Sequence, residues 1–187
     1  MNIPNIKPNR REWISAAAVA AIGALMLDAT ASRAQAQSAA TNGVTRSAEA
    51  IHQTISFPTA PPKRLYDALT IAAQFQKVES LSDAAKSMNL ATNPVTISTE
   101  PGGAFSIFGG YITGRQIELV PSERIVQAWR VGNWAPGQYS LARFQLAANG
   151  VGTTLTFDHT GFPVGDGEHL SEGWVLNYWQ PLTKFLG

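Results

Sequence analysis

Residues 168–186, EHLSEGWVLNYWQPLTKFL, decide how this chain folds. The large apolar side chains in this stretch recur every three or four positions, at Leu170, Trp174, Tyr178, Leu182 and Phe185. That spacing places them on one stripe of a helix and predicts a long C-terminal helix from about Glu168 to Leu186. Pro181 lies inside the helix and has no N–H to donate, so we expect a kink or a division near Asn177.

The chain before this helix alternates between apolar and polar residues, with turn residues about every 8–12 positions. In the last of these segments Leu155, Phe157 and His159 point to one face, which indicates a sheet buried on one side. The pattern predicts six strands of an antiparallel meander, over Val95–Thr99, Ala104–Phe108, Tyr111–Val120, Arg124–Arg130, Gln138–Leu146 and Gly152–His159.

A further strand is predicted nearer the N-terminus, over Ile51–Phe57. Prolines and helical spacing follow it and predict one or two short helices between Pro61 and Ser87. This order of elements makes an α+β domain, with a seven-stranded curved antiparallel sheet wrapped on the long C-terminal helix. A twisted sheet around a helix leaves a gap on its concave side unless bulky side chains fill it, and such a gap is a natural ligand site.

Residues 1–36 have the three regions of a cleavable export signal. Arg10-Arg11 precede an alanine-rich apolar run of 14 residues, Ile14–Leu27, and Ala34-Gln35-Ala36 has the pattern of a cleavage site. The paired arginines are typical of twin-arginine export signals. The alternative is a membrane anchor, but the run is shorter than the roughly 20 residues that span a bilayer. We therefore expect a periplasmic or secreted protein with no stable membrane anchoring after cleavage.

Residues 37–49 are small and polar and are interpreted as a flexible spacer, followed by one domain over 50–187. The predicted signal holds four basic and two acidic residues, so of the 14 basic and 13 acidic residues of the chain, 10 and 11 remain. This balance gives no basic face, and we expect no nucleic-acid partner. The absence of cysteine excludes disulfides, thiolate metal sites and cysteine nucleophiles.

Several motifs along the predicted domain carry a family resemblance: Gly102-Gly103-Ala104-Phe105, Phe108-Gly109-Gly110-Tyr111, His159-Thr160-Gly161, and Gly173-Trp174 followed by Tyr178-Trp179-Gln180-Pro181-Leu182. In this order they resemble the SRPBCC or START-like superfamily. The most similar subgroup is the one named for the C-terminal domain of the heat-shock-protein-90 ATPase activator. The resemblance implies a helix-grip fold over a hydrophobic cavity. It implies no universal catalytic set, because members include lipid and hormone carriers, polyketide cyclases and chaperone regulators.

The inner face of the sheet and the helix together present seven candidate ligand-binding side chains. A hydrophobic or aromatic ligand would stack on their rings, although the same residues equally suit an ordinary core. His159 is the polar member, either a general base or ligand-orienting group, or a structural histidine at the end of its strand. The seven are Phe105, Trp129, Phe144, Phe157, His159, Trp174 and Tyr178.

Metal and catalytic sites find little support in the sequence. His159, Glu168, His169 and Glu172 form too loose a set for three or four converging ligands, so we expect no metal and no cofactor. Ser140 and His159 with an acid would make a hydrolase triad, but the strained Gly-x-Ser-x-Gly turn is missing. No catalytic residue is predicted, and His159 is the candidate if one exists.

Three functions follow from these observations. The first is an exported, non-enzymatic binding protein that encloses a small hydrophobic or aromatic ligand between sheet and helix. The second is a cyclase- or hydrolase-type enzyme that uses the same cavity. The third is a module that regulates a chaperone ATPase, as the subgroup name suggests, although export would separate it from a cytosolic chaperone and its nucleotide.

Overall fold

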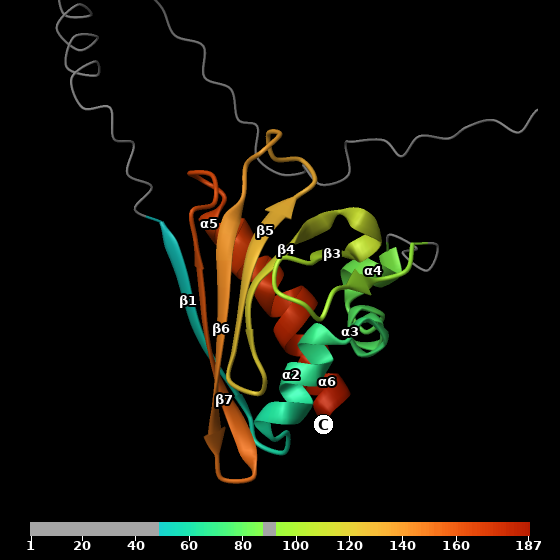
Figure 1. The fold of residues 1–187 in the computed structure, drawn as a ribbon, viewed down its shortest axis with the longest axis vertical. Coiled ribbons are helices and arrows are strands. Elements are labelled where there is room, and N and C mark those ends of the chain that lie inside the picture. Colours follow the sequence, from blue (N-terminus) through green and yellow to red (C-terminus); the bar gives the residue numbers. More distant parts are fainter. Residues whose placement is uncertain (1–48, 88–92) are drawn as a thin grey trace, which may run out of the picture. The chain divides into compact units, whose positions relative to one another are not determined.

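The computed structural model describes residues 49–87 and 93–187. The predicted export signal and nearly all of the predicted spacer lie outside the described residues. Figure 1 shows a sheet on one side and helices on the other. The elements run in the order β1 (Ala50–Phe57), α2 (Pro62–Thr70), α3 (Ala72–Glu79), α4 (Asp83–Ser87), β2 (Thr96–Ile97), β3 (Ala104–Ile107), the 3₁₀ turn η2 (Phe108–Gly110), β4 (Ile112–Val120), β5 (Arg124–Val131), β6 (Ser140–Asn149), β7 (Gly152–Thr160), α5 (Gly167–Trp174), the π-helical segment η3 (Val175–Trp179) and α6 (Gln180–Leu186).

The seven strands form one antiparallel sheet in the order β1-β7-β6-β5-β4-β3-β2. Strands β2 to β7 follow one another as a meander, and β1 joins the end of the sheet beside β7. The predicted α+β architecture, with seven antiparallel strands and a C-terminal helix, is confirmed. In β7 the buried residues alternate as predicted, with Leu155, Phe157 and His159 all on the inner face.

The short helices between β1 and β2 number three in the described chain, where one or two were predicted. The additional helix, α4, has only five residues, too few to display an apolar period. Its start is stabilised instead by Ser82, whose hydroxyl oxygen accepts the backbone N–H of Ala85 at 3.0 Å.

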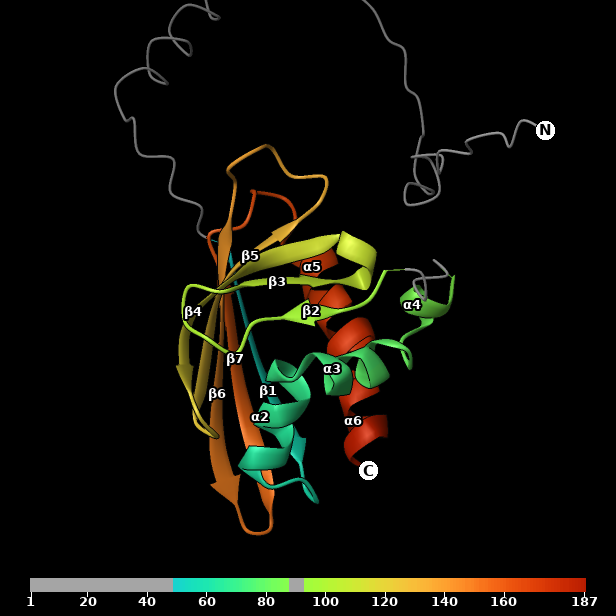
Figure 2. The same cartoon turned by 45° about the vertical axis from the view of Figure 1, so that its right-hand side comes forward.

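The C-terminal helical run changes its hydrogen bonding where Pro181 requires it. Segment η3 is π-helical, and the N–H of Gln180 donates to the carbonyl of Val175, five residues earlier. The predicted interruption near Asn177 is therefore confirmed, as a change of hydrogen-bond pattern with helical backbone angles on both sides. Figure 2 shows α5 and α6 following one another along the same side of the sheet.

The core lies between the inner face of the sheet and the helices, and its largest buried side chains include Trp174, Phe57, Phe75, Phe144 and Phe157. Gly109 and Gly110 in turn η2 have positive φ, at 65° and 87°, a conformation that glycine adopts without steric cost. No helix in the described ranges is long and apolar enough to cross a membrane.

Candidate functional site

The structure brings all seven predicted site residues onto one buried cluster between the sheet and the C-terminal helix. None of them is more than 5% exposed. Trp174 lies at the centre of the cluster, with its ring centroid 4.3 Å from that of Phe157, 4.2 Å from Tyr178 and 5.4 Å from Trp129. Their assignment to ligand binding stays a prediction. Their placement on one inner face follows from strand alternation and the helical stripe.

Trp179 belongs to the same cluster, and the sequence analysis did not include it. Its ring stacks on Trp174 with centroids 5.6 Å apart and planes at 19°. Its indole N–H donates to the side-chain oxygen of Gln53 on β1 at 2.6 Å. In an α-helix, residues three or four apart lie on one face, so the predicted apolar stripe left Trp179 out. The π-helical hydrogen bonding of η3 places Trp179 on the same face as Trp174, five residues earlier.

A cavity of about 10 Å³ lies beside the cluster, and of the seven predicted residues Phe105, Phe144 and Tyr178 line it. Its walls are Leu69, Phe75, Ile97, Phe105, Ile107, Ile125, Gln127, Phe144 and Tyr178. That volume suffices for roughly one water molecule. Pockets for drug-sized ligands measure roughly 300–1,000 Å³. Side chains therefore fill the concave side of the sheet at this position.

His159 is held by hydrogen bonds at both ring nitrogens. The indole N–H of Trp174 donates to Nδ1 at 3.0 Å, and Nε2 lies 2.6 Å from the hydroxyl of Ser140. Because an indole only donates, Nδ1 must be the acceptor and the proton of the neutral ring sits on Nε2. The Ser140 hydroxyl in turn donates to the carbonyl of Trp129 at 3.0 Å. Every polar atom of this network is paired.

Burial lowers the pKa of His159 to about 3. The ring is thus neutral at physiological pH, with no exposed surface. A hydrolase base needs the opposite tautomer, with Nε2 free to accept the serine proton and Nδ1–H directed at an acid. Here Ser140 and His159 are in contact, but the third member is the Trp174 indole, which is a donor. The geometry describes a structural network better than a triad.

Two polar atoms in the cluster are buried without a hydrogen-bond partner among the described residues, Trp129 Nε1 and Tyr178 Oη. Burial raises the pKa of the Tyr178 phenol far above its ordinary value. The nearby Trp129 N–H lowers this pKa, and the negative charge of Glu79 raises it further. Neither Trp129 Nε1 nor Tyr178 Oη, however, makes a hydrogen bond of ordinary geometry with a described residue. Buried groups of this kind are uncommon and are the places where a water or a ligand group would bind.

Tyr178→Phe tests whether the phenol is truly unpaired. Removing an unpaired buried hydroxyl should leave the free energy of unfolding unchanged or raise it by up to about 1 kcal/mol. Thr153→Val is the matched control, because the Thr153 hydroxyl is buried and donates to the carbonyl of Ala60 at 2.7 Å. Its loss should cost about 1–3 kcal/mol in urea unfolding. A cost of that size for Tyr178→Phe would mean that the phenol is paired, with the Trp129 N–H or with a bound molecule.

Glu79 is a buried carboxylate that the sequence analysis missed. It lies on α3, is 4% exposed, and accepts the backbone N–H of Phe108 at 2.9 Å. Burial raises its pKa, and the hydrogen bond from Phe108 partly offsets that rise. Phe108 has a φ of 50°, which non-glycine residues rarely adopt, so Glu79 stabilises a turn with an unfavourable backbone. A contact 29 residues away gives no local sequence signal.

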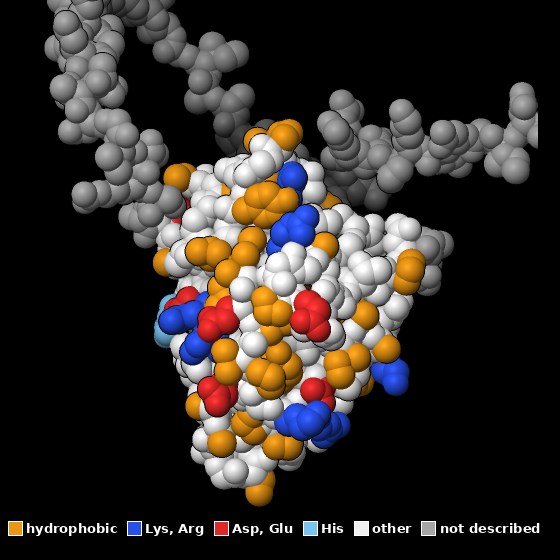
Figure 3. Space-filling view, viewed as in Figure 1, with side chains coloured by type: hydrophobic (Ala, Val, Ile, Leu, Met, Phe, Trp, Pro, Cys, Tyr) orange, Lys and Arg blue, Asp and Glu red, His pale blue; other side chains and the backbone are white. Residues whose placement is uncertain are grey.

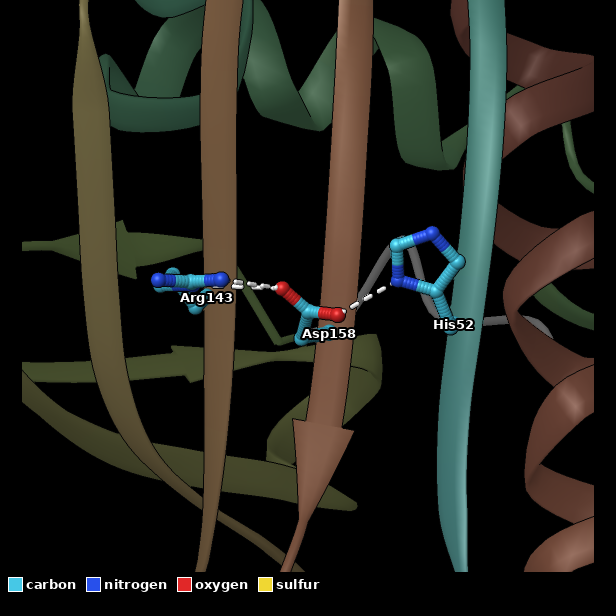
Figure 4. A network of polar contacts seen from close by, with 3 residues as sticks. All are labelled: His52, Arg143 and Asp158. Carbon is cyan, nitrogen blue, oxygen red and sulfur yellow. Dashed lines mark hydrogen bonds and ion pairs between the residues drawn. The ribbon is translucent and has the colours of Figure 1, made fainter.

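The outer face of the sheet carries a separate polar network, drawn in Figure 4. The Asp158 carboxylate on β7 accepts hydrogen bonds from Nδ1 of His52 on β1 and from Nη2 of Arg143 on β6, each at 2.6 Å. The hydrogen bond with His52, and then that with Arg143, holds the pKa of Asp158 below its ordinary value. Figure 3 shows charged side chains scattered among hydrophobic and uncharged ones on this side of the molecule. The network ties three neighbouring strands together.

A metal site is not formed by the described residues, which include no group of three His, Asp or Glu side chains arranged to hold an ion. The loose set around Glu168 and His169 is exposed. His169 and Glu172 are exposed residues on the surface of α5.

Comparison with known proteins shows the family. Residues 59–187 match the family described as "Activator of Hsp90 ATPase homolog 1-like protein". An activator of 90 kDa heat shock protein ATPase homolog from Dictyostelium discoideum is 37% identical over 83 residues, covering 44% of this chain and 22% of that protein. Homolog 2 from Mus musculus is 27% identical over 137 residues, covering 73% of this chain and 38% of that protein. The chain thus matches less than two fifths of the length of either relative.

A solved structure supports the fold. The crystal structure of an HSP90 activator from Plasmodium falciparum superposes with a TM-score of 0.63 at 22% sequence identity, covering 74% of this chain and 96% of that one. The sheet, the helical layer and the match over residues 59–187 agree with one another. The chain belongs to the Activator of Hsp90 ATPase homolog 1-like protein family.

Proposed function

We propose that residues 49–187 form a non-enzymatic protein-binding domain that regulates a chaperone ATPase of the 90 kDa heat shock type. The observation that carries this proposal is the filled interior. The cavity of about 10 Å³ beside Tyr178 is too small for a small-molecule ligand, which favours a domain that acts through its exterior. The relatives supply the partner class, since their names describe homologues of an activator of that ATPase.

His159 supports the same proposal, because its ring is neutral and is hydrogen-bonded at both nitrogens. General acid–base catalysis needs a group with a pKa near the working pH that can reach a substrate. His159 has a pKa of about 3 and no exposed surface, and both of its ring nitrogens are already used. A cyclase or hydrolase would need this network to break before each turnover.

The test is an ATPase assay of the 90 kDa chaperone from the same organism with purified residues 49–187. We expect the rate to rise several-fold with a saturable dependence on domain concentration. The same protein unfolded by heat beforehand is the control and should give no increase. An unchanged rate at a large excess of folded domain contradicts the proposal.

A second candidate function is an exported carrier of a small hydrophobic or aromatic molecule. Two observations favour it: the signal pattern in residues 1–36, and the orphan polar atoms of Trp129 and Tyr178 in the aromatic cluster. A carrier of this kind would have to displace core side chains to admit its ligand. It would work outside the cytoplasm, away from the chaperone and its nucleotide.

The double substitution Arg10→Lys, Arg11→Lys separates the two candidates. If the predicted twin-arginine signal operates, the wild-type chain is cleaved and exported and the double variant stays in the cytoplasm at precursor size. Cell fractionation and the mass of the mature chain measure both, with Lys7→Arg as the matched control that keeps the arginine pair. A wild-type chain that remains uncleaved in the cytoplasm excludes the carrier and leaves the chaperone regulator.

A further inference from the structure

Strand β1 lies at one edge of the sheet (Figure 1). Among the described strands it pairs with β7 alone, over its whole length from Ala50 to Phe57. The backbone groups on the other side of β1 pair with no strand formed by residues 49–87 and 93–187. An edge of this kind is a template for an additional strand unless something covers it.

A groove of about 560 Å³ runs along the beginning of this edge. Glu49, Ala50, Ile51 and His52, four consecutive residues, all line it. Side chains of neighbouring strand residues point to opposite faces of a sheet. A groove that touches both buried Ile51 and exposed His52 therefore lies against the edge of the strand, where its backbone groups are.

The opposite wall of the groove comes from the β7–α5 connection and the first turns of α5, with Phe162, Gly165, Gly167, Glu168 and Ser171. Hydrogen bonds hold this wall at a fixed place relative to β1. The N–H of Gly165 donates to the carboxylate of Glu49 at 3.2 Å, and the side-chain amide of Gln53 donates to the carbonyl and hydroxyl of Ser171 at 3.1 and 3.0 Å. The groove is thus formed before any partner arrives.

The groove carries two carboxylates and no basic side chain of Lys or Arg among its described lining residues. Glu49 lies immediately before β1, and Glu168 is exposed on α5. This charge favours a cationic occupant, while the strand edge favours an extended one. A second copy of this chain would bring the same carboxylates together and is disfavoured.

We infer that the groove beside β1 binds an extended segment of the partner protein as an eighth strand, with a Lys or Arg side chain between Glu49 and Glu168. The inference rests on the proposed function for its partner, and adds where and how that partner is held. The added strand would lie about 4.8 Å from β1, the ordinary spacing in a sheet. Backbone hydrogen bonds would provide affinity, and the basic side chain would provide selectivity.

The test uses the ¹⁵N-labelled domain and the capped peptide Thr-Val-Lys-Val-Thr, with Thr-Val-Glu-Val-Thr as the charge-swapped peptide. We expect the lysine peptide to shift the amide signals of residues 50–53 and to slow their hydrogen exchange, and the glutamate peptide to bind at least several-fold more weakly. Glu168→Lys should weaken binding of the lysine peptide by about three- to tenfold. Glu172→Lys is the matched control, because it makes the same change on an exposed part of α5 outside the groove.

Shifts at other residues, equal affinity for both peptides, or equal loss in the two variants would overturn the inference. Shifts of residues 50–53 that depend on protein concentration without peptide would show a second copy in the groove, and would also overturn it. The ATPase assay separates this failure from that of the proposed function. If the Glu168→Lys variant stimulates the chaperone ATPase as much as the wild type does, only binding in the groove is excluded. If the wild type itself gives no stimulation, the proposed chaperone-regulating function is excluded.

Discussion

Trp174→Ala is expected to lower the free energy of unfolding by about 3–5 kcal/mol. Trp174 is 2% exposed, and its ring contacts those of Phe157 and Tyr178 at centroid distances of 4.3 and 4.2 Å. The substitution removes the apolar ring, leaves a cavity and deprives Nδ1 of His159 of its donor. Because domains of this size are stable by roughly 5–15 kcal/mol, a large share of the total would be lost.

Urea unfolding followed by tryptophan fluorescence and circular dichroism measures this loss. Leu176→Ala is the matched control, since Leu176 is 53% exposed and lies two residues further along the same helical run. Its effect should stay within about 0.5 kcal/mol. A cost below about 1 kcal/mol for Trp174→Ala would contradict the central place given to this ring.

Acidification is the second large effect, and His159 causes it. Its pKa is about 3 in the folded chain and about 6.5 in the unfolded chain. Above pH 6.5 both states are neutral and the full stability is present. Between pH 6.5 and 3 the unfolded chain binds a proton that the folded chain does not, so stability falls as the pH falls. The slope is about 1.4 kcal/mol per pH unit, or roughly 5 kcal/mol over the interval.

His159→Gln isolates this contribution, because a glutamine amide also has an acceptor for Trp174 and a donor for Ser140 but does not titrate. The free energy of unfolding of the wild type should fall between pH 6 and pH 4 by about 1.4 kcal/mol per unit more than that of the variant. Ring ¹⁵N signals of the folded wild type should show the neutral tautomer with the proton on Nε2 down to pH 4. Equal slopes, or a ring that titrates near pH 6.5, would contradict the buried network.

The period with which apolar residues recur, and the spacing of the turn residues, were sufficient to predict the architecture. Alternation over residues 94–159 predicts the six-strand meander, and the stripe ending at Phe185 predicts the C-terminal helix, because one buried face per element leaves a regular trace in the sequence. The five-residue helix α4 left no such trace. The π-helical segment η3 was predictable only as an interruption, since Pro181 shows where an α-helical bond is lost and not which bond replaces it.

The candidate site was predictable as a set of residues but not as a filled space. Strand alternation placed Phe144, Phe157 and His159 on the inner face. Whether rings on that face leave a pocket depends on their rotamers and on the π-helical turn that brings Trp179 in beside Trp174. Contacts between distant parts of the chain, such as Gln53 with Trp179, also give no local signal.

The groove beside β1 could not be predicted from the sequence either, because it also depends on contacts between distant parts of the chain. It depends on β1 lying at the end of the sheet and on α5 standing opposite it, and neither is a property of one segment. Ile51 and His52 were predicted as strand residues without any indication of which neighbour β1 would have.

Native mass spectrometry of residues 37–187 purified from the native host would show whether side chains alone fill the space between the sheet and the C-terminal helix. We expect the mass of the polypeptide alone, because the cavity beside Tyr178 and Phe144 measures only about 10 Å³. A stoichiometric small molecule that leaves only when the domain unfolds would contradict it, and would make the exported carrier the function of this chain.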